Sequence, residues 1–219
     1  MAESANVKVV IGIPLSWGHL PWKFFRSYIE MLKPPETVVL RASSYSVADM
    51  RNMCAAWAVE ADASHLWMLD VDMVYPPDSL VKLLEADRDI IGGLAARRKP
   101  PHAPSYTVFG EDGELTIAAP PAGDDVIECA AVGGCGMLVK TSVFKNVPKP
   151  WFTDTATTKK GGALSEDIHF CLKAGAHGFQ TFCHTGLVFP HEVDVCVSLT
   201  KTVTGQWQPK YAEAEEYAR

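Results

Sequence analysis

Apolar and polar positions follow two different periods along the first 95 residues, and together they predict a sheet covered by helices. Short apolar runs typical of buried strands lie at residues 7–13, 37–42, 65–70 and 89–95. Between them, apolar residues recur at helical spacing over 21–33, 47–61 and 77–86. Strands that alternate with helices predict an α/β fold of three layers with a mainly parallel central sheet.

The pattern changes after residue 95, where prolines and glycines become frequent. The stretch "GEDGE" at 110–114 predicts a hairpin turn between short strands, so we expect this half to be antiparallel and irregular. A short helix is predicted at 141–147, and a longer one that begins after Ser165 as its N-cap and ends near Gly175 or Gly178. We expect the final strand at 179–184 and a terminal helix from about residue 208.

Length and composition limit the class of protein. A chain of 219 residues suits one domain, and an apolar share of 47% with a charged share of 21% is typical of a folded globular protein. The formal net charge of −6 argues against a broad electrostatic contact with nucleic acid or anionic lipid. A polyanionic partner would have to be bound by a local cluster of basic residues.

Neither a membrane span nor a secretory signal is indicated by the pattern. No apolar run approaches the roughly 18 residues that cross a bilayer, and the start of the chain lacks a basic segment followed by an apolar one. We therefore expect a cytoplasmic protein without membrane contact. Its six cysteines show no CxxC spacing and are interpreted as buried free thiols.

Two carboxylates, Asp70 and Asp72, end the third apolar run. Residues i and i+2 of a strand point to the same face, and ligands of open parallel sheets bind beyond the carboxyl ends of the strands. Two close carboxylates repel unless a cation lies between them or one is protonated. The pair therefore suits Mg²⁺ or Mn²⁺, which prefer oxygen ligands.

Other interpretations of this pair stay open. One aspartate can cap the following helix while its neighbour is solvated. The stretch "DVDMV" also fits the DxDx[TV] signature of haloacid-dehalogenase-like phosphatases, in which the first aspartate is a nucleophile. That signature follows the first strand in those enzymes, whereas here it follows the third.

Four further positions carry candidate chemistry. Glu166 and Asp167 fall in the first turn of a predicted helix, where the helix dipole stabilises a carboxylate, and Asp167 is the better general base of the two. Acidic residues also favour that turn for structural reasons. His184 and His191 are seven residues apart and separated by Pro190, so we expect one of them, rather than both, to bind a metal.

The order of these motifs resembles that of the GT-A glycosyltransferases, especially small family-2-like members. The motifs are "IGIPLS", "MRN" on a helix, "LDVDM" after an apolar strand, "AAVGGCGMLVKTSVF", "SEDIHFCLKAG" and a late histidine. They cover most of the chain, from about residue 7 to 193. The resemblance implies a nucleotide-binding half at about 7–95, an acceptor and catalytic half at about 96–195, and a C-terminal tail at 196–219.

The resemblance also implies roles for particular residues. Asp72 would bind the metal ion directly, Asp70 would contact the ribose or the metal, and His191 would be the late metal ligand. Asp167, with Glu166 beside it, would be the catalytic base. The positions expected to border the donor and acceptor are Ile13, Pro14 and Ser16 near the base, Arg51 near Asp70 or the diphosphate, and Gly133 and Gly134 near the sugar.

Two basic stretches are further candidates. "TATTKKGG", with Lys159 and Lys160, is a candidate lid over the donor, and "ARRK" at 96–99, with Tyr106 nearby, is a candidate contact for diphosphate or a phosphorylated acceptor. Either stretch can equally be a solvated segment. Many relatives place an acidic residue after the second strand to bind the base, whereas this chain has "RASSY", which leaves the nucleotide open.

The function expected from these motifs is metal-dependent transfer of a sugar from a UDP- or GDP-sugar, with inversion and with Mn²⁺ or Mg²⁺ as cofactor. A retaining enzyme of the same fold and a non-catalytic nucleotide-sugar-binding module are the alternatives. Relatives of this size occur in bacteriophages, where a modified DNA base is one acceptor; a glycan is another.

Overall fold

A computed structural model describes residues 8–16, 18–98, 101–121, 123–157, 161–192 and 196–212. Its centre is a seven-stranded sheet of order β2-β1-β3-β9-β4-β10-β7. The strands are β1 (Val9–Pro14), β2 (Thr37–Ala42), β3 (His65–Met68), β4 (Ile90–Ala95), β7 (Val126–Cys129), β9 (Leu138–Lys140) and β10 (Thr181–Phe189). Of these, β7 and β9 run antiparallel to their neighbours, so β1, β2, β3, β4 and β10 all point the same way. The predicted α/β fold with a mainly parallel sheet is confirmed.

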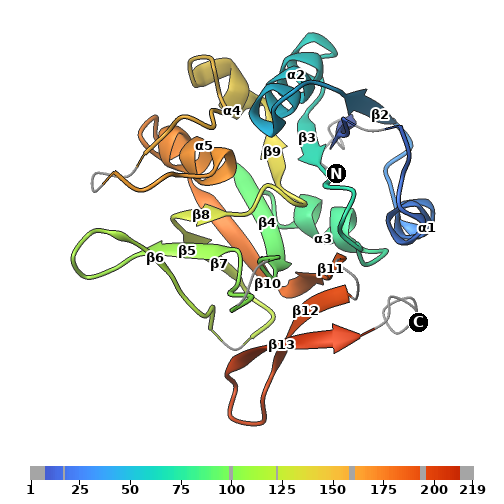
Figure 1. Cartoon of the computed structure of the whole chain (residues 1–219). Helices are drawn as coiled ribbons and strands as arrows, with labels where there is room; N and C mark the ends of the chain where they lie inside the picture. The colour runs from blue at the N-terminus through green and yellow to red at the C-terminus, as the bar shows by residue number, and fades with distance from the viewer. Residues whose placement is uncertain are drawn as a thin grey trace, which may run out of the picture.

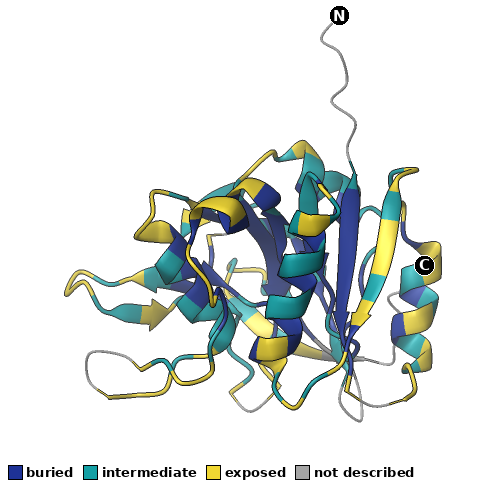
Figure 2. Ribbon diagram, turned by 90° about the horizontal axis from the view of Figure 1, so that it is seen from above, coloured by how far each residue is buried: buried dark blue, intermediate teal, exposed yellow. Residues whose placement is uncertain are grey.

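Helices cover both faces of this sheet (Figure 1). Their bounds are α1 (Trp22–Glu30), α2 (Val47–Glu60), α3 (Ser79–Glu85), α4 (Thr141–Asn146) and α5 (Glu166–Gly175). One apolar core packs Phe24 of α1 and Leu80 of α3 against the sheet, and a second core lies under α2, α4 and α5. In Figure 2 the central strands are buried, whereas the helices expose residues on their outward sides. None of the described helices is long and apolar enough to cross a membrane.

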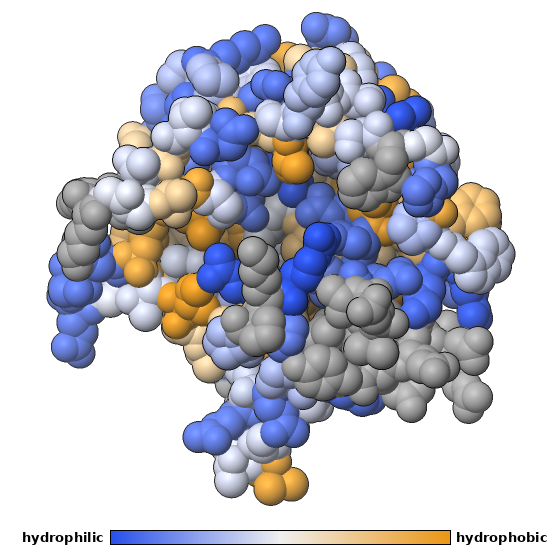
Figure 3. All heavy atoms as spheres, viewed as in Figure 1, coloured by the Kyte–Doolittle hydropathy of each residue, from blue (hydrophilic) through white to orange (hydrophobic). Residues whose placement is uncertain are grey.

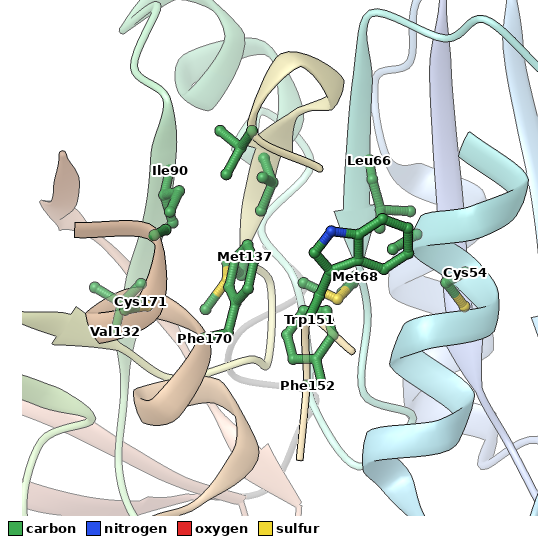
Figure 4. Packing of buried hydrophobic residues seen from close by; sticks show 14 of the residues in the cluster. Cys54, Leu66, Met68, Ile90, Val132, Met137, Trp151, Phe152, Phe170 and Cys171 are labelled. Atoms are coloured by element: carbon green, nitrogen blue, oxygen red, sulfur yellow. The ribbon is translucent and has the colours of Figure 1, made fainter. Parts of the chain in front are cut away.

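Aromatic rings fill the second core. Phe152 and Phe170 stack with their ring centroids 4.5 Å apart, and Phe144 stacks on Phe170 at 5.4 Å. Figure 4 shows Trp151 and Phe152 between α5 and α2, near Met68 of β3. Asn52 of α2 holds this segment, because its side chain bonds the backbone of Trp151 and of Phe152. These contacts fix the start of α5 relative to α2 and β3.

Two small sheets complete the fold. Strands β5 (Tyr106–Phe109), β6 (Leu115–Ile117) and β8 (Ala131–Val132) form one of them, with the predicted hairpin turn between β5 and β6 and Gly113 at φ 74°. The other consists of β11 (His191–Glu192), β12 (Cys196–Lys201) and β13 (Trp207–Ala212). The strand predicted at 179–184 corresponds to β10, which extends to Phe189 and is not the final strand, because β11, β12 and β13 follow it. Residues 208–212 belong to β13 and do not form the predicted helix.

Candidate metal and donor site

The carboxyl ends of the parallel strands place the predicted site residues along one edge of the central sheet. Asp70 and Asp72 follow β3, residues 96–98 follow β4, and His191 follows β10. Figure 3 shows strongly hydrophilic side chains gathered near the centre of the face seen in Figure 1. This is the edge at which open α/β sheets bind their ligands.

Asp72 and His191 are joined by the backbone, although 119 positions separate them in the sequence. Met73 and His191 form an antiparallel bridge, the Glu192 N–H donates to the Asp72 carbonyl at 2.6 Å, and the Val74 N–H donates to the Pro190 carbonyl at 2.9 Å. As a result His191 Nε2 lies 3.1 Å from Asp72 Oδ2. The backbone bridge therefore brings the two side chains to the same point of the site.

His191 has the form that a metal ligand needs. Its Nδ1 lies 3.0 Å from the Ala96 carbonyl, which can only accept, so Nδ1 carries the proton. Burial lowers the pKa of His191 and favours the neutral ring, despite the opposing effect of the bond to Ala96. The Arg98 Nε donates to His191 Nε2, so Nε2 acts as an acceptor, and its lone pair and the Asp72 carboxylate converge on one point.

The guanidinium of Arg98 lies at that point. The Arg98 Nε donates to His191 Nε2 at 3.3 Å, and Arg98 Nη2 pairs with Asp72 Oδ2. One carboxylate oxygen and one imidazole nitrogen are a donor set that Mn²⁺ or Mg²⁺ can share with water and phosphate oxygens. The residues present thus fit a divalent ion, with Asp72 and His191 as its protein ligands.

Asp70 pairs with Arg51, which is one of the two roles that the resemblance implied for Arg51. Strand β3 ends at Met68, so Asp70 and Asp72 lie in the following loop and strand alternation does not align them. Both oxygens of Asp70 accept from Arg51 Nη2, at 3.0 and 3.1 Å. Within the described residues no three His, Cys, Asp or Glu side chains converge to hold one metal ion.

Tyr75 fixes the turn that separates the two aspartates, and sequence reasoning did not identify it. Its hydroxyl accepts from the Asp70 N–H at 3.0 Å and donates to the Asp70 carbonyl at 3.1 Å. The ring is buried and packs against Trp67 and Phe189. Tyr75 therefore holds the Asp70 backbone while the Asp70 side chain reaches Arg51.

Arg51 is the centre of the charged network. It is only 2% exposed, and it donates to the Gly134 carbonyl at 2.9 Å and to Glu166 Oε1 at 3.0 Å, besides Asp70. The guanidinium thus joins α2 to the loop after β3, the loop before β9 and the start of α5. A Cβ at Gly134 would lie 2.5 Å from Arg51 Cζ, so this glycine makes room for Arg51. The resemblance had implied instead that it borders the sugar.

The charged network shifts the pKa of Arg51 and that of Glu166. Burial tends to lower the pKa of Arg51, but Asp70, Glu166 and Asp167 outweigh burial and raise it. Burial raises the pKa of Glu166, and the neighbouring Asp167 adds to the effect, although Arg51 opposes both. Arg51 stays charged, whereas Glu166 takes up a proton more readily than an exposed glutamate.

Asp167 is held beside Gly133 at the start of α5. Its Oδ2 accepts from the Gly134 N–H at 2.8 Å, and its Oδ1 accepts from Ser165 Oγ at 2.5 Å and from the Ile168 N–H at 2.7 Å. Ser165 is the N-cap residue, but its side chain makes no capping bond to the helix backbone and binds Asp167 instead. Asp167, Gly133 and Arg97 line a small cavity of about 60 Å³.

The remaining predicted positions differ in their surroundings. Ile13 and Pro14 end β1 and are buried, whereas Ser16 is exposed. Arg41, near the end of β2, donates to the Leu15 carbonyl at 3.1 Å. Tyr106 is buried in β5. Lys99, Lys159 and Lys160 lie outside the described residues.

His184 does not share the position of His191. It pairs with Gly93 in the sheet, and a register shift follows it in β10. Burial lowers its pKa, and its charged neighbours are Asp124, Lys82 and Asp78. Of the two histidines, His191 is the one beside Asp72.

Comparison with known proteins reveals a shared fold. The sequence matches no family model and no curated protein. The structure is similar to that of A197 from STIV, with a TM-score of 0.56, 17% identity, and coverage of 94% of this chain and 96% of that one. It is also similar to GalNAc-T7 solved with UDP, GalNAc and Mn²⁺, with a TM-score of 0.53 and 12% identity, over 87% of this chain and 44% of that one. The chain has a mixed α/β fold of GT-A-like architecture.

Proposed function

We propose that this protein is a metal-dependent glycosyltransferase that moves a sugar from a nucleotide-sugar donor to an acceptor hydroxyl. The observation that carries the proposal is the pair formed by Asp72 and His191, with Nε2 and Oδ2 3.1 Å apart and the Arg98 guanidinium in contact with both atoms. This pair lies at the ligand-binding edge of a sheet of GT-A-like architecture. GalNAc-T7, which has a similar fold, was solved with UDP, GalNAc and Mn²⁺, and this supports a UDP-sugar and Mn²⁺ here.

Asp72 and His191 would hold the divalent ion. When bound, that ion supplies positive charge that stabilises the leaving diphosphate. Arg51 keeps the Asp70 carboxylate oriented, so that Asp70 is available to a donor hydroxyl rather than to the metal. The end of β1 lies at the same edge of the sheet. Its last residues, Ile13 and Pro14, and Ser16 just after it are proposed to border the nucleotide.

Asp167 is the proposed base, with inversion as the expected outcome. Three donors orient its carboxylate, but among the described residues Oδ2 accepts only from the Gly134 N–H and keeps a lone pair for the proton of the acceptor hydroxyl. The small cavity beside Asp167 and Gly133 is the proposed entry for that hydroxyl. Glu166 belongs to the Arg51 network and is proposed to hold Arg51 rather than to react.

The acceptor is proposed to be a modified DNA base or a glycan. The net charge of −6 means that a nucleic-acid acceptor would need a local cationic contact. Arg97, which lines the cavity beside Asp167, is the described residue best placed to provide one.

A phosphatase of the haloacid-dehalogenase type is less well supported. Its nucleophile would be Asp70, and both oxygens of that carboxylate accept from the buried Arg51. Such a carboxylate is poorly placed to attack phosphorus.

The proposal is tested by release of nucleoside diphosphate from UDP- and GDP-sugars. We expect slow hydrolysis of one donor in the presence of Mn²⁺ and its loss when EDTA removes the ion. Release that continues unchanged in EDTA would contradict metal dependence, and binding of the donor without release would favour a non-catalytic binding module.

A further inference from the structure

The positive group beside Asp72 is the guanidinium of Arg98, a residue to which the proposed mechanism gives no role. The Arg98 guanidinium touches the same two atoms that the proposed metal site uses, His191 Nε2 and Asp72 Oδ2. A divalent ion needs the lone pairs of both atoms, and Arg98 donates to both. We propose that Arg98 is the counter-cation of the metal-free site and that a divalent ion binds by displacing it. The inference rests on the proposed function, because it takes Asp72 and His191 as the ligands.

Asp72 and His191 need such a counter-cation when no metal is bound. The backbone bridge of Met73 to His191 brings Oδ2 and Nε2 to 3.1 Å from each other, and Nε2 accepts from the Arg98 Nε. Two electron-pair donors at that distance repel each other unless a positive group lies between them. The planar guanidinium presents separate N–H groups to the two atoms, whereas a lysine ammonium is a single point charge. Arg98 therefore balances the charge of the two ligands before the ion arrives.

Arg98 can also leave without disturbing the fold. Its side chain is 59% exposed, in contrast to the 3% of Arg51 in the neighbouring network. The segment around it is held by the backbone, through the bridge of Ala96 to Pro104 and the bond from the Arg97 N–H to the Ala103 carbonyl. The bond between the Ala96 carbonyl and His191 Nδ1 does not involve the guanidinium. His191 thus keeps its orientation after Arg98 has moved.

The exposure of Arg98 sets the size of the competition. An exposed ion pair is weak, so a divalent ion with its higher charge displaces Arg98 readily. The free energy of the lost ion pair still weakens binding, and the apparent Kd for the ion rises accordingly. We expect the Kd for Mn²⁺ to be about two- to fivefold higher in the native chain than in a chain without this guanidinium.

The test is isothermal titration of Mn²⁺ alone, without nucleotide, into the full chain and its variants. Arg98→Ala is expected to bind Mn²⁺ about two- to fivefold more tightly than the native chain, and Arg98→Lys is expected to lie between them. The matched control is Arg97→Ala, which removes the same charge from the adjacent residue. Both variants lose the long-range effect of one positive charge, but only Arg98→Ala also loses the contact with the two ligand atoms. Arg97→Ala should therefore change the Kd for Mn²⁺ less than twofold.

The possible results separate the inference from the proposed function. Equal Kd values for the native chain and Arg98→Ala, or an equal gain in Arg97→Ala, would overturn the inference while metal binding itself stands. Absence of Mn²⁺ binding in every variant would overturn both. A second measurement uses the ¹⁵N resonance of Arg98 Nε in solution: addition of diamagnetic Mg²⁺ should shift it as the contact with His191 is lost, and an unchanged resonance at saturating Mg²⁺ would contradict displacement.

Discussion

Replacing Asp72 by Asn is expected to lower metal-dependent turnover of the donor at least about 100-fold. The substitution keeps the shape of the side chain but removes the charge that attracts the divalent ion, and about 2.7 kcal/mol of lost stabilisation corresponds to that factor. The backbone bridge between Met73 and His191 remains, so the fold should be unaffected. The measurement is the rate of nucleoside diphosphate release at saturating Mn²⁺, together with a thermal unfolding curve.

Asp78→Asn is the matched control for this change. Asp78 lies six positions further along the chain, and its side chain is 45% exposed and pairs with Lys82. Its substitution should leave the rate within twofold, since an exposed i,i+4 pair contributes little. Native-like turnover in Asp72→Asn would mean that the carboxylate is no metal ligand.

Replacing Arg51 by Met is expected to destabilise the protein by about 3–5 kcal/mol, because it removes one partner from a buried charge network. Asp70 and Glu166 would lose their counter-ion, and the Gly134 carbonyl would lose its donor. Arg51→Lys should recover only part of this loss, since an ammonium cannot reach three groups in the plane of a guanidinium. Equilibrium unfolding in urea measures the change.

A control with the same local geometry is available in α1. Arg26 Nε lies 3.0 Å from Glu30 Oε1, the same distance as Arg51 Nε from Glu166 Oε1, but Arg26 is 43% exposed. Arg26→Met should therefore cost only about 0.3–0.5 kcal/mol. Equal losses for the two variants would show that burial of the Arg51 network does not stabilise the fold.

Much of the fold could be predicted from the sequence because its first half is built of local patterns. The runs at 37–42 and 89–95 and the helical spacing at 47–61 correspond to β2, β4 and α2 within one or two residues. The C-terminal part was predicted less well, because its polarity was interpreted as a helical tail. Gly205, at φ 80°, turns the chain between β12 and β13, and the signal that indicates a hairpin is the β-branched residues before it together with Trp207 and Tyr211 after it.

The candidate site was only partly predictable. The sheet pattern placed Asp70 and Asp72 at the ligand-binding edge but left His184 and His191 as alternatives. The choice of His191 as the late metal ligand came from the resemblance to GT-A glycosyltransferases, and the structure places His191 in contact with Asp72. The different contacts of Asp70 and Asp72 depend on where β3 ends and on the hydrogen bonds of the Tyr75 hydroxyl. No periodic pattern in the sequence predicts either feature. Arg98 is 93 residues from His191 in the sequence, and no local pattern indicates that contact.

The most direct test of the metal site is a crystal structure with Mn²⁺ and UDP, with the ion identified by its anomalous scattering. The account predicts one Mn²⁺ bound to Asp72 Oδ2 and His191 Nε2, with Arg98 displaced from both atoms and Asp70 still paired with Arg51. An anomalous peak elsewhere, or a structure at saturating Mn²⁺ in which Arg98 still lies between Asp72 and His191, would contradict it.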